Sequence, residues 1–430
     1  MHYSEACTYL NELQFFKIKL GLEAVSTLLA KIGSPHTSFP AIHLAGTNGK
    51  GSVGATLLSL LRYNGYKVGF YSSPHLSSVR ERFSINKKSI DRQTFAELAT
   101  TIRDTLGSQP ITYFEFTTAL AFLWFQQQKV DIAIIETGLG GRLDATNVIT
   151  PLVSVITTID LDHQEYLGNT LTQIAGEKAG IIKDTVPVVS GVQDHTAQEV
   201  IKTTCLQKQN TLYTLGTDFT CQPITPTTFT YTGITGTQLQ GLHCALQGKH
   251  QQANSCLALA TAEVLQQKGF HLAEEKVAQA MQKTKWPGRM ESVASGKGQN
   301  IRHFILDGAH NEAGIQALNH TLQDTFNAKR IVLVWGNMAD KNLGPAWLAL
   351  LDKAAVIVLT QAETTRSATA EQLEEHVPTH YRSRVYCSDD VDNALEYAAT
   401  HTTPEDLILI AGSLYLVGKA RELLLGKNTL

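Results

Sequence analysis

The sequence has few cysteines and no closely spaced cysteine pair. Its six cysteines, among 430 residues, include neither a C-x-x-C pair nor the spacing of a zinc finger. A disulfide framework and a cysteine-based zinc site are therefore not expected, and unpaired thiols suit a reducing compartment. The first twenty residues also contain no apolar stretch long enough for a signal peptide or a membrane span, so we expect a cytoplasmic protein without a membrane partner.

The sequence also lacks a strong excess of charge of either sign. Its formal net charge is −3, from 36 basic and 39 acidic residues, so we expect no broad surface for nucleic acid. An anionic ligand must then be held by a local site. The apolar content of 43% and the charged content of 17% are typical of a globular protein, and the length favours two domains.

Short apolar runs alternate with amphipathic stretches along the first half of the chain. Runs such as 41–45 and 130–135 are typical of buried parallel strands, and the stretch 53–63 is typical of a helix. Residues 211–240, rich in threonine and turn residues, indicate a small antiparallel insertion. Strand-like runs return in the second half. We therefore predict an α/β protein with two parallel-sheet domains, the second of them Rossmann-like.

A glycine-rich loop follows the first predicted strand and precedes a predicted helix. Backbone N–H groups of such a loop can hold phosphate oxygens, Lys50 supplies a cation, and Ser52 could ligate Mg²⁺. The match to G-x-x-x-x-G-K-[ST] is imperfect, because Leu44 occupies the first glycine position and Gly51 separates Lys50 from Ser52. A turn without a ligand is the alternative. The predicted strand before the loop and the predicted helix after it favour a P-loop-type ATPase domain. The residues expected to bind a nucleotide here, which the resemblance described below implies to be ATP, are Gly46, Thr47, Asn48, Gly49, Lys50, Gly51 and Ser52.

Polar side chains stand where two later strands are predicted to end. Glu136 is a candidate Mg²⁺ ligand, because active-site residues of open α/β sheets gather at the carboxyl ends of strands. His163 could complete a metal site, although a lone loop histidine is more often a capping or surface residue. The sequence around Lys178, taken by itself, predicts that this lysine lies on the solvated face of a helix. Asn254 is equally suited to be a helix N-cap.

Several segments together resemble the Mur ligase superfamily, specifically its folylpolyglutamate synthase branch. The loop at 46–52 is similar to the loop of that family, and ETGLGGRLDATN at 136–147 differs from the family signature only at Thr137, where valine is usual. Similar blocks are YSSPHL at 71–76, LDH at 161–163, GKHQQAN at 248–254, WPGRME at 286–291 and DGAHN at 307–311. At the end of the last block Glu312 replaces a proline. The resemblance covers nearly the whole chain.

The resemblance implies roles that the residues alone do not establish. It implies ATP and two Mg²⁺ ions as cofactors, with a monovalent cation as a further candidate, and it implies that Lys178 is carbamylated. Residues implied in metal binding are Ser52, Ser73, Glu136 and His163. Further residues implied in ATP binding are Asn254, Arg289 and Asp307, and those implied in catalysis are Lys50, Lys178, Asp307 and His310.

A pterin or folate site is implied as well. Phe114 could stack on the pterin ring, and packing in an aromatic core explains the same residue equally well. The residues implied in this site are Ile18, Leu20, Arg82, Thr112, Phe114, Asp144 and Ala145.

The activity implied is the ATP-dependent ligation of L-glutamate to dihydropteroate and to folyl(poly)glutamates through an acyl phosphate, by a monomer. Activity on folylpolyglutamates alone is the alternative.

We expect an ATP-binding domain at 1–284, a linker at 285–297 and a glutamate-ligase domain at 298–430. A cell-wall Mur ligase is disfavoured. Its extra N-terminal domain would have to come from the residues before Gly46, and this segment is shorter than a domain that usually folds alone. A non-enzymatic nucleotide-binding module would tolerate loss of Glu136, His163 and Lys178, and all three are present.

Overall fold

A computed structural model describes residues 1–13, 21–296, 301–326, 330–339, 341, 343–363 and 367–426. The chain divides into two compact units. Unit 1 comprises residues 1–74, 79–245 and 251–285, and unit 2 comprises residues 75–78, 246–250 and 286–430. None of the helices in these described ranges is long and apolar enough to cross a membrane.

Unit 1 is built on an eight-stranded sheet with the order β4-β3-β2-β5-β1-β6-β7-β8. Its parallel strands are β1 (Ala41–Ala45), β2 (Val68–Tyr71), β5 (Ile132–Glu136), β6 (Val153–Ile156), β7 (Val188–Ser190) and β8 (Leu212–Thr214). The antiparallel strands β3 (Phe83–Ile85) and β4 (Lys88–Ser89) extend one edge. Every residue of β1, β2, β5 and β6 is buried, as expected of a parallel sheet covered on both faces.

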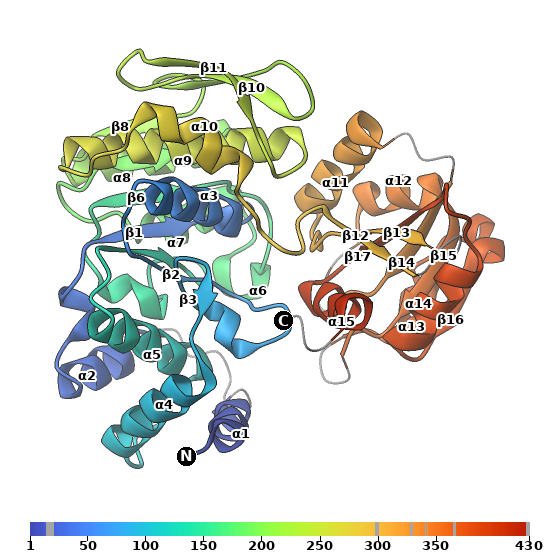
Figure 1. Cartoon of the computed structure of the whole chain (residues 1–430), viewed down its shortest axis with the longest axis horizontal. Helices are drawn as coiled ribbons and strands as arrows, with labels where there is room; N and C mark the ends of the chain where they lie inside the picture. Colours follow the sequence, from blue (N-terminus) through green and yellow to red (C-terminus); the bar gives the residue numbers. More distant parts are fainter. Residues whose placement is uncertain are drawn as a thin grey trace. The chain divides into compact units, whose positions relative to one another are not determined.

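Helices cover both faces of this sheet (Figure 1). One apolar cluster joins the sheet to α1 (Tyr3–Leu13), α2 (Glu23–Lys31), α4 (Arg92–Leu106) and α5 (Tyr113–Gln127). The remaining long helices of the unit are α3 (Lys50–Tyr63), α7 (Leu171–Ala179), α8 (His195–Gln207), α9 (Lys249–Gln267) and α10 (Glu274–Gln282). The close approach of Gly54 in α3 to Phe70 of β2 shows how tightly the helix after β1 lies on the sheet, since a Cβ at Gly54 would be 2.4 Å from that ring.

A small antiparallel sheet interrupts the parallel pattern of unit 1. It consists of β9 (Thr220–Pro223), β10 (Thr228–Thr232) and β11 (Gln238–His243), in the order β11-β10-β9. This confirms the antiparallel insertion predicted within 211–240. The start of that stretch differs from the prediction, because β8 pairs with β7 in the main sheet.

Unit 2 is a second α/β layer structure. Its six-stranded sheet contains, in order, β12 (Glu291–Ser295), β13 (Arg302–Leu306), β17 (Leu407–Ala411), β14 (Ile331–Trp335), β15 (Ala354–Thr360) and β16 (Val385–Ser388). Only the edge strand β12 is antiparallel to its neighbour. The stretch 285–297, where we expect a linker, thus includes β12.

The two faces of this second sheet carry separate apolar clusters, and Figure 1 shows helices on both faces. One face is covered by α11 (Glu312–Thr325), α12 (Pro345–Lys353) and α13 (Ala370–Glu375). The other face is covered by α14 (Val391–Thr400) and α15 (Leu414–Leu425). The prediction of a second α/β domain is confirmed.

Candidate active site

The glycine-rich loop connects β1 to α3, and the end of the neighbouring strand β6 holds it in place. The backbone N–H of Thr47 donates to the carbonyl of Thr158 at 2.8 Å. The Asn48 N–H donates to the Thr158 hydroxyl at 3.1 Å, and the Thr157 hydroxyl donates to the Asn48 carbonyl at 2.6 Å. Thr157 and Thr158 are therefore supports of the loop, a role that their sequence position after a predicted strand did not reveal.

Two glycines of the loop cannot carry a side chain. A Cβ at Gly46, where φ is +153°, would lie 1.8 Å from the Thr157 hydroxyl oxygen. Gly49 has φ +88°, and a Cβ there would lie 2.5 Å from Oδ1 of Asn254. The loop thus touches Asn254, which is buried in α9. Because α9 begins at Lys249, the alternative interpretation of Asn254 as an N-cap is wrong.

Lys50 and Ser52 occupy the first turn of α3. The Lys50 ammonium donates to the carbonyls of Gly46 at 2.8 Å and Thr47 at 3.4 Å, so the charge is held against the loop. Ser52 is buried. The arrangement combines a cation with the positive end of a helix, and both features favour the binding of phosphate.

Glu136 ends β5, the strand beside β1, and its side chain is only 4% exposed. Its Oε2 accepts a hydrogen bond from the Ser73 N–H at 3.4 Å, so the structure brings two of the predicted metal ligands together. His163 precedes the short helix α6 (Gln164–Leu167) with φ +49°, and its side chain makes no capping hydrogen bond to that helix. The His163 side chain is 43% exposed, which agrees with the alternative of a surface residue, whereas a capping role is not supported.

Lys178 lies in the last turns of α7 and is buried, with 3% of the residue exposed. The expectation of a solvated helix face is thus wrong. Burial lowers the pKa of Lys178 to about 7, and the charge of Lys50 acts in the same direction. Asp162 and Asp160 act in the opposite direction. The structure therefore places Lys178 within electrostatic reach of the phosphate loop and of two carboxylates.

The loop after Glu136 packs against the helix that carries Lys178. The Arg142 N–H donates to the Glu177 carbonyl at 2.7 Å, and the two side chains form an ion pair at 2.8 Å. A Cβ at Gly141 would lie 2.8 Å from the carbonyl oxygen of Glu177. This contact between segments distant in sequence explains why the local pattern around Lys178 predicted exposure.

Two of the residues implied in the pterin site, Phe114 and Asp144, lie against the loop after Glu136. The Phe114 ring stacks on Tyr71, with centroids 5.8 Å apart, and lies against Gly138 so closely that a Cβ there would be 2.6 Å from the ring. Both oxygens of Asp144 accept hydrogen bonds, and Oδ2 accepts from the N–H groups of Gly138 and Leu139 at 2.8 Å each. Phe114 and Asp144 thus bracket one loop.

The other described members of this set have structural partners of their own. Arg82 is buried, and its guanidinium lies 5.2 Å from the centre of the Tyr113 ring. Thr112 is the N-cap of α5 and forms a capping box with Glu115. Ala145 opens the short 3₁₀ helix 145–148. Ile18 and Leu20 lie outside the described residues.

In unit 2 the block at 307–311 follows β13. Asp307 is buried, and its carboxylate accepts from the N–H groups of Met290 and Ala309 at 2.9 Å each. Arg289 lies close by, since a Cβ at Gly308 would be 2.4 Å from its guanidinium. Nδ1 of His310 is 2.8 Å from the Gly308 carbonyl oxygen. Because a carbonyl can only accept, Nδ1 carries a proton, and in a neutral ring Nε2 is then the acceptor. Arg289, Asp307 and His310 are therefore held in one loop system.

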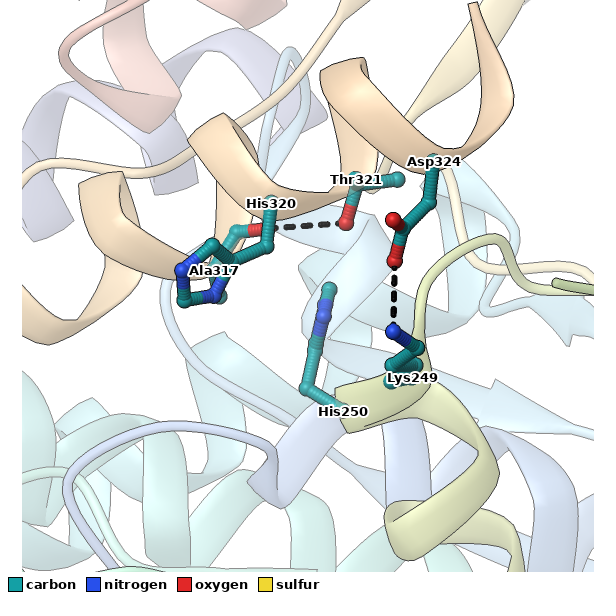
Figure 2. A pocket seen from close by; sticks show the side chains of 6 residues that line it. All are labelled: Lys249, His250, Ala317, His320, Thr321 and Asp324. Carbon is teal, nitrogen blue, oxygen red and sulfur yellow. Dashed lines mark hydrogen bonds and ion pairs between the residues drawn. The ribbon is translucent and has the colours of Figure 1, made fainter. Parts of the chain in front are cut away.

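A cavity of about 260 Å³ lies beside these residues in unit 2 (Figure 2). It is lined by Lys249 and His250 and by one side of α11, and Lys249 pairs with Asp324 at 2.9 Å. Burial lowers the pKa of His250, the Asp307 carboxylate opposes that shift, and Arg289 adds to it. His250 therefore links the cavity electrostatically to two of the predicted ATP-binding residues.

Glu312, which replaces the proline of the family pattern, has a structural partner. Its Oε1 accepts from the Ala346 N–H at 2.8 Å, in the first turn of α12, and its Oε2 lies against Gly344. A carboxylate in this position satisfies an N–H group that the helix itself leaves without a partner. Glu312 thus caps a neighbouring helix.

The donor atoms around the phosphate loop suit Mg²⁺. The hydroxyls of Ser52 and Ser73 and the carboxylate of Glu136 are hard oxygen donors, and Ser73 and Glu136 are already in contact. In the part of the chain that the structure describes, no three His, Cys, Asp or Glu side chains form a closed metal cage. Mg²⁺ needs none when substrate phosphates and water complete its coordination.

Comparison with known proteins places these features in context. Residues 44–262 match the Mur ligase middle domain, and residues 288–414 match the glutamate ligase domain of Mur ligases. The chain is 34% identical over 433 residues to the dihydrofolate synthase/folylpolyglutamate synthase of Bacillus subtilis (strain 168), with 98% of each chain covered. It is 32% identical over 438 residues to the folylpolyglutamate synthase of Lacticaseibacillus casei, with 99% of each chain covered.

A solved structure supports the same relationship. The structure of an Escherichia coli relative in complex with DHPP and ADP superimposes with a TM-score of 0.89 at 30% identity. The alignment covers 100% of this chain and 99% of the relative. Sequence and fold therefore agree over both units.

Proposed function

This chain belongs to the dihydrofolate synthase/folylpolyglutamate synthase family of Mur ligases, and we propose that it joins L-glutamate to dihydropteroate and to folyl(poly)glutamates at the expense of ATP. The observation that carries the proposal is the grouping of Lys50, Glu136 and Lys178 around the loop at the carboxyl ends of β1 and β5. Open α/β sheets bind their ligands at this edge.

The chemistry consists of two displacements. A carboxylate oxygen of the pterin substrate attacks the γ-phosphorus of ATP, the bond to ADP breaks, and an acyl phosphate forms. The amino group of glutamate then attacks the acyl carbon, phosphate leaves, and the nitrogen loses a proton to give the amide. Lys50 and the loop amides neutralise charge that develops on the phosphoryl oxygens. Catalysis in this scheme is mainly positioning and electrostatics.

Ser52, Ser73, Glu136 and His163 would hold Mg²⁺, and a bound Mg²⁺ would supply further neutralisation of the phosphates. Ser73 and Glu136 support this assignment by their contact. Beyond the loop, the residues proposed to bind ATP are Asn254, which touches Gly49, and Arg289 and Asp307. His310 is proposed to act in catalysis.

Lys178 is proposed to carry a carbamate. The ammonium first loses a proton. The neutral amine then attacks carbon dioxide, a C–N bond forms and a second proton leaves, so the side chain changes from a cation to an anion. The pKa of about 7 supports this, since much of the amine is then neutral near pH 7. A carbamate would remove the repulsion between Lys178 and Lys50 and place a negative charge near the phosphate loop.

The pterin-containing substrate is proposed to bind near Phe114, Asp144 and Arg82. The aromatic ring of Phe114 offers a stacking surface, and the Gly138 loop beneath it is fixed by Asp144. Activity on folylpolyglutamates alone remains the second candidate, because the Lacticaseibacillus casei relative is named for that activity only. The cytoplasmic location and the monomeric state remain predictions from the sequence.

Incubation of the enzyme with ATP, Mg²⁺ and glutamate tests the proposal, with either dihydropteroate or a reduced folate as acceptor. We expect glutamate-dependent ADP release with both acceptors, and product masses increased by one glutamyl residue. ADP release with the reduced folate alone would select the second candidate. Release with neither acceptor would refute the function.

A further inference from the structure

His43 is a buried histidine in the middle of β1, three residues before the phosphate loop. The residue is fully buried, and its register partners on the adjoining strands are Ile135 of β5 and Ser154 of β6. A buried imidazole in a parallel strand is costly unless its polar atoms have partners. The position of His43 therefore calls for a physical reason.

The partner of His43 is Thr146, in the loop that follows Glu136. Nε2 of His43 lies 2.8 Å from the Thr146 hydroxyl oxygen. The Thr146 hydroxyl donates to Oδ1 of Asp144 at 2.5 Å, and since a hydroxyl has one proton, Nε2 of His43 must be the donor to Thr146. Among the described residues, Nδ1 of His43 has no hydrogen-bond partner. The imidazole is thus a neutral donor with its proton on Nε2.

Charge considerations agree with this protonation state. Burial lowers the pKa of His43 to about 3, and the nearby charge of Lys183 acts in the same direction. The ring therefore stays neutral across the pH range in which proteins work.

The same chain of hydrogen bonds ends on the loop at the candidate pterin site. Asp144 accepts from Thr146 with one oxygen and from the N–H groups of Gly138 and Leu139 with the other. Gly138 lies two residues after Glu136 and directly beneath the Phe114 ring. A shift of Asp144 would therefore move the backbone on which Phe114 rests.

We propose that His43 is a positioning residue for the pterin substrate, acting through Thr146 and Asp144 on the Gly138–Leu139 backbone. This inference rests on the proposed function. It assigns a second role to the strand that leads into the phosphate loop, because a side chain of that strand supports the Gly138–Leu139 backbone. Each link from Nε2 of His43 to Oδ2 of Asp144 pairs a donor with an acceptor, and buried chains linked in this way rigidify a site.

The test compares His43→Leu with His43→Gln in the full-length enzyme. Leucine fills the space without a donor, whereas the glutamine amide can supply an N–H near the position of Nε2. We expect kcat/KM for dihydropteroate to fall about tenfold in His43→Leu, the factor expected for one lost hydrogen bond, while KM for ATP stays within about twofold. His43→Gln should restore most of the loss.

Two further variants separate positioning from general destabilisation. Thr146→Val breaks the same chain at the next residue and should produce the same selective loss, also when His43→Leu does not fold. Ser59→Ala is the matched control. It removes a buried hydroxyl of α3 that donates to the Ala280 carbonyl of α10 at 2.7 Å. This control variant should lower the melting temperature without changing the ratio of KM for dihydropteroate to KM for ATP.

A readout independent of activity keeps this inference distinct from the proposed function. Hydrogen–deuterium exchange at the Gly138 and Leu139 amides should be faster in His43→Leu than in the wild type, and unchanged in Ser59→Ala. Equal losses toward ATP and dihydropteroate, no rescue by glutamine, or unchanged exchange would overturn the role of His43. A wild-type enzyme inactive with all pterin acceptors would instead refute the function and leave the exchange result to decide the role.

Discussion

Lys178 is buried within electrostatic reach of Lys50, the lysine of the phosphate loop, and the two positive charges oppose each other. Burial is the largest cause of the low pKa of Lys178, and Lys50 is the second. Two lysines in such an arrangement are most stable when one is neutral or has become an anion. This relationship supports an exchange of the amine for a carbamate.

The protonation of Lys178 should be visible in stability. Its pKa is lowered from 10.5 to about 7 on folding, so between these values the unfolded chain binds more protons than the folded one. In buffer free of carbon dioxide, the free energy of unfolding should therefore rise by about 2 kcal/mol between pH 7 and pH 9 relative to Lys178→Met. Chemical denaturation of both proteins at several pH values measures this difference, and parallel profiles would contradict it.

The carbamate itself is open to direct observation. With ¹³C-labelled bicarbonate, the wild type should show a carbamate carbon resonance that Lys178→Met lacks. Lys178→Arg is the matched control, since it keeps a cation that cannot be carbamylated near neutral pH. We expect both variants to lose glutamate-dependent ADP release, and a fully active Lys178→Arg enzyme would exclude a required carbamate.

Lys50→Ala should abolish measurable ligase activity while leaving the fold intact. The ammonium of Lys50 is held over the loop by two carbonyls, where phosphoryl charge would develop. Removal of such a group is expected to lower kcat by at least about 10²-fold to 10³-fold. Lys88→Ala, at an exposed lysine of β4, should behave as the wild type in the same ADP-release assay. Near-normal turnover of Lys50→Ala would remove Lys50 from the mechanism.

Gly49→Ala and Gly65→Ala form a matched pair. Both glycines have positive φ, +88° and +97°, so both alanine variants carry backbone strain on the order of 1 kcal/mol. Only at Gly49 would the new Cβ meet Asn254, whereas nothing lies within 4 Å of a Cβ at Gly65. Both should melt at a lower temperature, and only Gly49→Ala should raise KM for ATP. Equal KM values in the pair would show that the contact with Asn254 is unimportant for the nucleotide.

Glu312→Ala should destabilise the protein without altering catalysis. The variant removes the cap on the Ala346 N–H, and lost caps cost about 1 kcal/mol. Glu312→Gln, which keeps an oxygen acceptor, should retain most of the stability. Denaturant unfolding and KM for ATP, measured together, check both expectations, and an increase in KM without a change in stability would place Glu312 at the active site instead.

Local patterns in the sequence predicted the parts of the fold that depend on neighbouring residues. The run 41–45 became β1, and the glycine-rich loop followed it, because a buried strand, a tight turn and a helix start are all encoded within a few residues. The edge strand β16 was not predicted, since its burial varies from the exposed Tyr386 to the buried Ser388 and gives no continuous apolar run. The N-cap interpretation of Asn254 was wrong because α9 begins five residues earlier, at Lys249, and the sequence alone does not distinguish an asparagine at a helix start from one inside the helix.

The features that were not predictable depend on contacts between distant segments. Lys178 is buried because the Gly141 loop lies on the last turn of α7. The residues near Lys178 in the sequence do not predict this contact. The same holds for His43, which meets Thr146 only when β1 and the loop after β5 come together. Asp144, although part of a recognisable motif, shows its support of the Gly138 backbone only in the folded chain.

Transfer of oxygen from substrate to phosphate tests the central claim most directly. Dihydropteroate labelled with ¹⁸O in its carboxylate is incubated with the enzyme, ATP, Mg²⁺ and glutamate, and the inorganic phosphate is analysed by mass. Activation through an acyl phosphate predicts one ¹⁸O atom in the phosphate for each amide formed from fully labelled substrate. Unlabelled phosphate accompanying amide formation would contradict the account.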